Sequence, residues 1–185
     1  MKKFPFIFSL ILLLVIALFV LQSQFYRVSS SKKLIDQYKR ELSGLGLASL
    51  NSQDIPISAI IIYNYNVIGR GFNTVLRDSD AGGHAVINAI SDAIKNVGLE
   101  NFMNFSRDSL KLVTTYEPCA MCKGALHEYK INKVEFLKSK SLSHWLESSY
   151  TDFLYELNKR RLDAAEIQDS LFRLHPAYRE ELPDY

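Results

Sequence analysis

Three side chains that can bind a metal ion constrain the fold of this chain more than any other feature. His84 stands just before an apolar helical pattern, and Cys119 and Cys122 follow Pro118 at the start of another. The chain has no other cysteine. Zinc prefers imidazole nitrogen and thiolate sulfur, and a catalytic zinc site keeps three protein ligands and one water. We therefore predict a Zn²⁺ site in which the N-termini of two helices meet.

The positions of these residues support zinc over other uses of two cysteines. A helix N-terminus favours thiolate over thiol, and residues at i and i+3 share one helical face. A redox pair or two structural thiols are the alternatives, but Pro118 and the upstream His84 favour zinc. A closed structural site needs a fourth protein ligand, for which His127, His144 and His175 are remote candidates.

The pattern of apolar residues predicts alternating strands and helices. The expected strands are Ile57–Tyr63, Val67–Phe72, Leu110–Thr115 and Lys133–Leu137, and the first two should form a hairpin. The expected helices are Lys32–Leu42 (ended by Gly44 and Gly46), Ala85–Val97, Cys119–Tyr129 and Thr151–Leu162. Residues 73–83 are expected to form a loop. This order predicts an α/β fold, with a central sheet covered by helices on both faces.

An uncharged apolar run extends from Phe4 to Leu21, after Lys2 and Lys3. As a helix it would be about 27 Å long, close to the roughly 30 Å hydrocarbon core of a bilayer. A signal peptide cleaved after Ser30 is an alternative, and a buried core helix a more remote one. We predict an N-terminal transmembrane helix, a lipid bilayer as partner through residues 4–21, and a single-pass membrane localisation.

The charges beside this run conflict about the side of the membrane. Two lysines precede it, whereas a larger basic group follows it, and the positive-inside rule counts both flanks. The basic residues that follow are Arg27, Lys32, Lys33, Lys39 and Arg40. The side of the membrane therefore stays open.

The charge balance bears on nucleic-acid binding. The net charge is +2, from 22 basic and 20 acidic residues, and Lys2 and Lys3 account for the excess. The remaining chain is neutral, so the broad basic face that nucleic-acid binding requires is not expected. We divide the chain into an anchor (1–22), a linker (23–31), a zinc-binding domain (32–165) and an irregular C-terminal tail (166–185).

Three blocks of sequence carry a family resemblance: residues 67–73 (VIGRGFN), 84–90 (HAVINAI) and 115–126 (TYEPCAMCKGAL). They resemble the cytidine and deoxycytidylate deaminase superfamily, closest to its tRNA-adenosine and guanine deaminase arm. The resemblance implies a three-layer αβα fold with a mixed five-stranded sheet. His84 stands where free cytidine deaminases carry Cys, which favours the deoxycytidylate and tRNA-adenosine side. The resemblance also implies that Asn73 contacts the base or sugar, that Glu117 supports the metal loop, and that the protein is a homodimer.

One residue departs from the family pattern. The signature is H-x-E followed by P-C-x-x-C, and its Glu is the general acid and base. Val86 occupies that position here and has no titratable group. Because such a group contributes about 10² to 10⁴-fold in rate, we predict a zinc-binding pseudo-deaminase that binds a nucleobase-containing small molecule.

Two other functions stay open from the sequence. The chain could be an active, divergent deaminase of cytosine, adenine or guanine bases that uses Glu117, Asp78 or Asp80 as its proton shuttle. It could also be a structural or interaction module whose zinc only stabilises the fold. The purely structural explanation of Val86 is that it belongs to the apolar stripe of an amphipathic helix.

Overall fold

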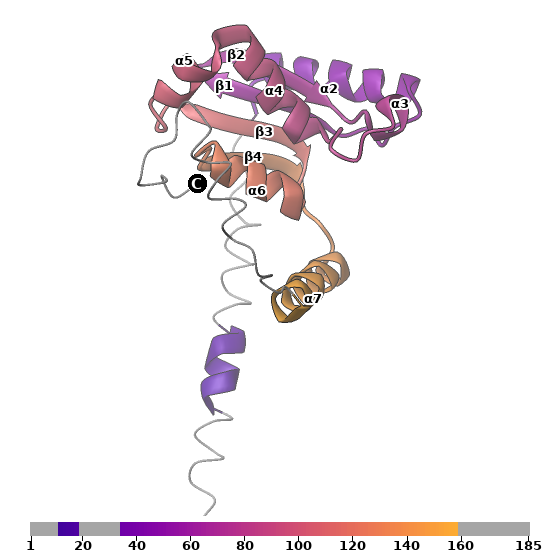
Figure 1. Ribbon diagram of the computed structural model, residues 1–185, viewed down its shortest axis with the longest axis vertical. Helices are drawn as coiled ribbons and strands as arrows, with labels where there is room; N and C mark the ends of the chain where they lie inside the picture. Colours follow the sequence, from indigo (N-terminus) through magenta and orange to yellow (C-terminus); the bar gives the residue numbers. More distant parts are fainter. Residues whose placement is uncertain (1–10, 19–33, 159–185) are drawn as a thin grey trace, which may run out of the picture. The chain divides into compact units, whose positions relative to one another are not determined.

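The computed structural model describes residues 11–18 and 34–158, apart from several side chains near the C-terminal end of this range. The chain divides into two compact units, Met1–Gly44 and Leu45–Tyr185. The second unit contains the sheet (Figure 1) and the three residues His84, Cys119 and Cys122. The predicted boundaries at residues 31/32 and 165/166 lie outside the described residues and remain predictions.

The predicted transmembrane helix is wrong for the structure described here. No helix among the described residues is long and apolar enough to cross a membrane. Within the predicted span of 4–21, residues 11–18 are helical, and residues 4–10 and 19–21 lie outside the described part. The same finding removes the support for the predicted bilayer contact and membrane localisation.

The sheet is built around the predicted hairpin. Strands β1 (Ser58–Tyr63) and β2 (Asn66–Phe72) pair antiparallel. Asn64 and Tyr65 join them with φ values of 47° and 66°, the left-handed geometry of a tight two-residue hairpin turn. Strand β3 (Leu110–Tyr116) pairs antiparallel with β1, and β4 (Lys133–Lys138) pairs parallel with β3. The resulting strand order is β2-β1-β3-β4.

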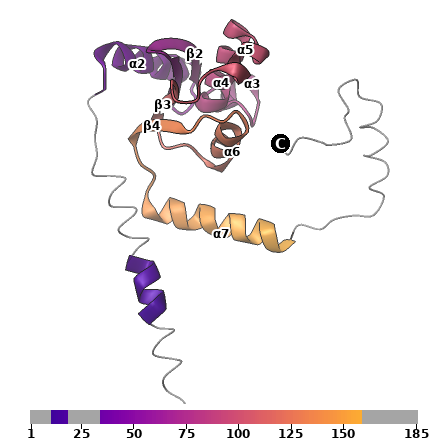
Figure 2. The ribbon, with the colours of Figure 1, turned by 90° about the vertical axis from the view of Figure 1, so that its left-hand side faces the viewer.

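The described sheet has four strands, which corrects the five strands that the resemblance implied. After β4 the chain passes through residues 139–141 into helix α7 (Leu142–Asn158) and not into another strand (Figure 2). The backbone N–H of His144 donates to Ser141 Oγ at 3.3 Å, a side-chain cap that favours a helix start here. Residues 139–158 contain one β-branched residue, Thr151, whereas the short strands β1 and β3 contain three each.

Helix α4 (Ala85–Val97) lies across β2 and β1 (Figure 1), with the predicted bounds and with Gly98 at its C-terminal end. It packs beside α6 (Ala120–Glu128). These helices and one face of the sheet form a core that includes Ala59, Ile61, Leu112, Val86, Ala89, Ile90, Ala93, Cys122 and Leu126. The opposite face is also buried, at Ile60, Ile62 and Val113. Both faces are apolar because the central strands carry continuous apolar runs.

Glycines in β2 allow α4 to approach the sheet closely. A Cβ at Gly69 would lie 2.6 Å from Cβ of Ala93, and a Cβ at Gly71 would lie against the backbone of Ala85 and Ala89. Real side chains do not reach such distances, so any larger residue would push α4 outward. The two glycines therefore help to set where the N-terminus of α4 lies.

Helix α2 (Asp36–Asn51) starts and ends later than predicted and continues through Gly44 and Gly46. A helical glycine costs about 1 kcal/mol relative to alanine, which tertiary contacts can outweigh. In the last turns, the buried hydroxyl of Ser49 lies 2.8 Å from the carbonyl oxygen of Ile55 and 3.0 Å from that of Asn73. These long-range contacts carry no signal in local sequence.

The remaining differences concern short or terminal helices. Helix α3 (Val75–Asp78) interrupts the expected loop over 73–83, and α5 (Leu99–Asn104) was not predicted. Helix α7 begins at Leu142 and not at Thr151, and residues 159–162 of its predicted span lie outside the described part. Single-turn helices show too few periodic positions to be recognised from sequence.

Candidate metal centre and cavity

The three predicted zinc ligands come together at two adjacent helix N-termini. His84 is the N-cap residue of α4, and Cys119 is the N-cap residue of α6. Cys122 follows one turn into α6 and is buried. Because α4 packs against α6, segments separated by strand β3 meet at one point, as the motif requires.

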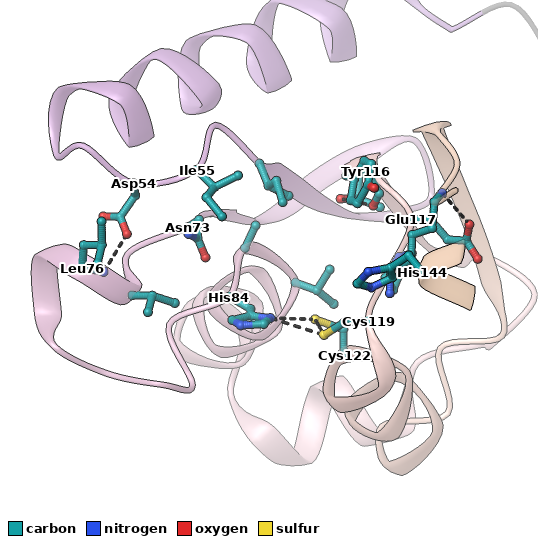
Figure 3. A pocket seen from close by; sticks show the side chains of 17 residues that line it. Asp54, Ile55, Asn73, Leu76, His84, Tyr116, Glu117, Cys119, Cys122 and His144 are labelled. Atoms are coloured by element: carbon teal, nitrogen blue, oxygen red, sulfur yellow. Dashed lines mark hydrogen bonds between the residues drawn. The ribbon is translucent and has the colours of Figure 1, made fainter. Parts of the chain in front are cut away.

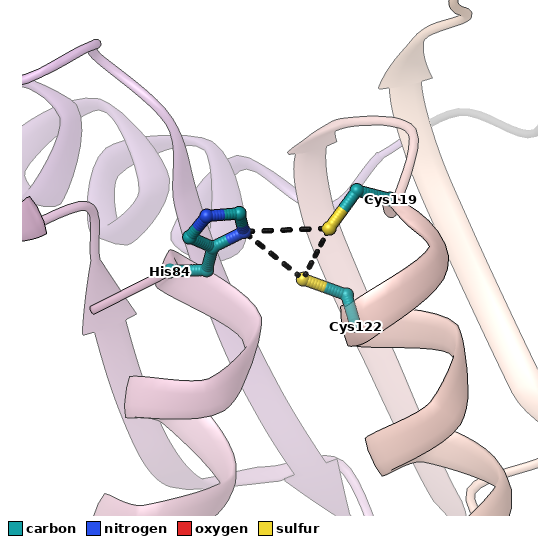
Figure 4. A group of neighbouring side chains, drawn as sticks. All are labelled: His84, Cys119 and Cys122. Atoms are coloured by element: carbon teal, nitrogen blue, oxygen red, sulfur yellow. Dashed lines mark hydrogen bonds between the residues drawn. The ribbon is translucent and has the colours of Figure 1, made fainter. Parts of the chain in front are cut away.

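The donor atoms form a compact triangle (Figure 4). Nδ1 of His84 lies 3.3 Å from Sγ of Cys119 and 3.7 Å from Sγ of Cys122, and the two sulfurs are 3.4 Å apart. Tetrahedral zinc with its usual bond lengths separates two sulfurs by about 3.8 Å and a sulfur from a nitrogen by about 3.6 Å. The observed triangle fits a zinc ion with changes of a few tenths of an ångström.

The surroundings of Cys119 favour its thiolate form. The hydrogen bond from Cys122, aided by a backbone hydrogen bond and by His84, lowers the pKa of Cys119 to about 4 against the opposing effect of burial. The hydrogen bond to Cys119, together with burial, raises the pKa of Cys122. One proton shared between two sulfurs explains the opposite directions. A bound cation would displace that proton, since zinc takes thiolate ligands.

These three residues are the only candidate metal-binding group within the described part of the chain. None of the predicted additional histidines belongs to it. His127 is exposed on α6, His144 lies elsewhere on the cavity wall, and His175 is outside the described residues. Three ligands leave one position open, as in catalytic zinc sites.

The metal-binding triangle opens into a cavity of about 370 Å³ (Figure 3). Aliphatic side chains dominate one wall: Ile55, Ile57, Val75, Leu76, Ala85 and Val86. Polar groups come from Asp54, Asn73, Thr114, Tyr116, Glu117, Lys140 and His144. An apolar cavity with a few polar groups beside a metal site is typical of small-molecule binding.

Val86 lines this cavity from the first turn of α4 and is 3% exposed. It belongs both to the hydrophobic core and to the cavity wall. The core explanation of Val86 is therefore correct but incomplete, because the residue also replaces a titratable group with a methyl surface beside the metal ligands.

The predicted substitute carboxylates are poorly placed. Glu117 lines the cavity, but its Oε2 accepts a hydrogen bond from the backbone N–H of Lys140 at 3.0 Å. Figure 3 shows this carboxylate turned away from the cysteines. Asp78 forms two hydrogen bonds with Arg77, at 2.8 and 2.9 Å, and Asp80 accepts one from Gly82 N–H. Neither aspartate lines the cavity.

Asn73, for which the resemblance implies a contact with the base or sugar, lies in the cavity wall and is 8% exposed. Its backbone is held on both sides: its N–H donates to Ile57, and its carbonyl accepts from Ser49. Within the described part of the chain its side-chain amide makes no hydrogen bond. The amide therefore offers both a donor and an acceptor to a ligand.

Asp54 is a cavity residue that sequence reasoning missed. Its carboxylate is 2% exposed and accepts hydrogen bonds from the backbone N–H groups of Leu76 and Arg77 and from Ser52 Oγ. Burial raises its pKa, but these hydrogen bonds outweigh burial and the pKa is lowered. Asp54 thus caps α3 and holds that side of the cavity. The only sequence signal was an Asp in a turn-like segment.

His144 and Lys140 are the other cavity residues whose position no local pattern revealed. Both follow β4, beyond the region covered by the resemblance. Figure 3 shows the His144 imidazole on the same side of the cavity as Glu117. Their placement depends on how the chain leaves β4, which is a tertiary property.

Comparison with known proteins agrees with this site. The profile of the cytidine and deoxycytidylate deaminase zinc-binding region matches residues 34–138. A tRNA-specific adenosine deaminase of Streptococcus pyogenes serotype M1 is 30% identical over 134 residues, which cover 68% of this chain and 75% of that protein. One from Buchnera aphidicola subsp. Schizaphis graminum is 32% identical over 83 residues, or 45% of this chain. This chain spans about half the length of two Buchnera relatives, 52% and 55%.

Solved structures share the fold. Guanine deaminase from Bacillus subtilis superposes with a TM-score of 0.56 at 23% identity, covering 78% of this chain and 98% of that one. A structure from work on A-to-I editing by tRNA A34 deaminases superposes with a TM-score of 0.51 at 23% identity, covering 57% and 77%. With zinc-binding residues in place and this fold around them, the chain belongs to the family of cytidine and deoxycytidylate deaminase zinc-binding domains, in its tRNA-adenosine deaminase arm.

Proposed function

We propose that this protein binds a nucleobase-containing ligand beside zinc and does not deaminate it at an enzymatic rate. The observation that carries the proposal is Val86, which lines the cavity next to the metal ligands in place of the family's proton-transferring Glu. The kinship with tRNA-adenosine and guanine deaminases supports a nucleobase as the bound group. A homodimer, implied by the resemblance, remains a prediction that sedimentation would check.

Different residues of this chain would bind the metal ion and the ligand. His84, Cys119 and Cys122 would hold the ion, which when bound lowers the pKa of a coordinated water to near 7. Asn73 would donate to and accept from the ligand, and the apolar wall around Ile55 would exclude water from its ring. Val86 cannot move a proton between that water and the ring nitrogen, so turnover would lack a step that contributes about 10² to 10⁴-fold.

A divergent active deaminase is the competing function. It would need a carboxylate that reaches both the zinc-bound water and the base. Glu117 is the only one of the three suggested carboxylates that lines the cavity, and its Oε2 already accepts the Lys140 N–H. Ammonia release decides between the two functions.

The test uses the full chain with measured zinc content and a panel of nucleobases, nucleosides, nucleotides and tRNA. We expect zinc binding and ligand-induced stabilisation without ammonia release, and a gain of deaminase activity in Val86→Glu. Val86→Gln is the matched control, since it adds similar bulk and polarity without an acid. Parent turnover well above that of a metal-free sample would contradict the proposal, as would zinc content unaffected by His84→Ala.

A further inference from the structure

We propose that His144, on the first turn of α7, is a reversible fourth zinc ligand that closes the open coordination position. The inference rests on the zinc site proposed above and concerns what occupies its remaining position. Imidazole is a preferred zinc donor, and Cys₂His₂ is a common closed set. Within the described cavity wall, His144 is the one imidazole other than His84.

Hydrogen bonds of Glu117 connect the segment before α7, which leads to His144, with the loop before α6 (residues 117–119). Glu117 immediately precedes Pro118 and Cys119, and its N–H donates to the carbonyl oxygen of Lys138 at 2.9 Å. Its Oε2 accepts the N–H of Lys140 at 3.0 Å. Glu117 therefore ties the start of the α7 segment to the loop that carries Cys119, and so acts as a positioning residue.

The first turn of α7 is ordered by its own cap, in which Ser141 Oγ accepts the N–H of His144. This hydrogen bond holds the backbone of His144, and its side chain is exposed. The ring is not among the donor atoms that lie within 4.8 Å of one another. His144 would therefore bind zinc only after its ring or α7 moves toward the ligands, and would release zinc when that movement reverses.

Val86 makes this closure more favourable. In the family pattern a Glu at this position hydrogen-bonds the zinc-bound water and so competes with any incoming ligand. A valine offers no acceptor to that water, and its methyl groups line the cavity instead. An imidazole can then replace the water without breaking a protein hydrogen bond.

The experiment is zinc X-ray absorption spectroscopy on the full-length, zinc-loaded chain without added ligand. Multiple scattering from imidazole rings should correspond to two histidines in the parent and one in His144→Ala. The zinc affinity of His144→Ala, measured by chelator competition, should fall about 10- to 100-fold, the scale seen when support of a zinc site is lost. His127→Ala, an exposed histidine outside the cavity, should change neither quantity.

A gain-of-ligand variant keeps the test independent of stability. In cobalt-substituted His144→Cys, a third thiolate should raise the sulfur-to-metal charge-transfer absorption by about half, since two thiolates become three. One imidazole in the parent, with unchanged absorption in this variant, would overturn the role of His144 but leave the three-ligand site intact. Absence of bound zinc in the parent would instead overturn the proposed function.

Discussion

At the scale of single residues, the metal-binding positions of the site keep the family's side chains, whereas its proton-transfer position does not. His84, Cys119 and Cys122 form a triangle that fits zinc, while Val86 places an apolar surface where the family's proton carrier stands. The ligands lie at helix N-termini, where the dipole favours negative sulfur. The structure therefore brings the metal-binding side chains together and has a side chain without a titratable group at the family's Glu position.

Alkylation of the metal-free, freshly reduced chain tests the state of Cys119. Its pKa is lowered to about 4, so above that pH it is a thiolate, and its rate with iodoacetamide should stay nearly constant from pH 8 to pH 6. An unperturbed thiol would lose about tenfold per pH unit over that range. Peptide mass mapping should place the label on Cys119, because the pKa of Cys122 is raised. Zinc-loaded protein, the control, should be protected, and a tenfold fall per unit would contradict the assignment.

At the scale of elements, the position of α4 on β2 determines whether the ligands meet. Gly69 and Gly71 give the helix room to approach the strand, and His84 stands at the helix end nearest Gly71. On the other side of the cavity, Asp54 caps α3 through two backbone N–H groups. Contacts between elements thus help to position the residues that would hold the metal and line the cavity.

Gly71→Ala tests this coupling. The added methyl would collide with the backbone of Ala85 and Ala89, so we expect a loss of about 1–3 kcal/mol in the free energy of unfolding, typical of overpacking. Zinc affinity should fall as well, because His84 adjoins Ala85. Gly124→Ala is the matched control: nothing lies within 4 Å of its added methyl, and in helix α6 it should stabilise by about 0.5–1 kcal/mol. Denaturant unfolding measures the free energy of unfolding, and chelator competition measures the zinc affinity. Equal effects of the two variants would contradict the coupling.

At the scale of the whole molecule, the zinc ligands come from two segments of the second unit that lie far apart in the sequence. One ligand follows the hairpin, and the other two follow β3, so a bound ion links segments that only the folded chain brings together. A ligand that binds only the folded state stabilises it, by an amount that grows with the logarithm of the ratio of free ligand to Kd. Metal binding should therefore be visible in global stability.

Removal of zinc by a chelator should lower the melting temperature. At free zinc of 100 times Kd, the stabilisation is about 2.7 kcal/mol, or about 5–11 °C for a domain of this size. Calorimetry of the full chain with and without zinc measures the shift. His84→Ala should show little zinc-dependent shift, and an equal shift in that variant would place the metal elsewhere.

Much of the fold and site followed from local pattern. The hairpin, α4, β3, α6 and β4 were predicted within a few residues, because each carries its own periodicity and end signals. The metal ligands were predicted from residue type and spacing, and the structure brings all three together. The apolar run over 4–21 predicted a membrane-spanning helix, but no helix among the described residues is long and apolar enough to cross a membrane.

The sequence by itself determined the zinc donor set, the family and the missing proton carrier, since these depend on which residues are present and in what order. Only the tertiary structure decided that the described sheet has four strands, that Asp54 and His144 line the cavity, and that Glu117 is bonded to the start of α7. Those facts depend on contacts between segments far apart in the chain, which leave no local signal. His84, Ala85 and Val86 help to identify the family from sequence. Only the structure shows that Val86, in place of the family's Glu, lines the cavity beside the metal-binding residues.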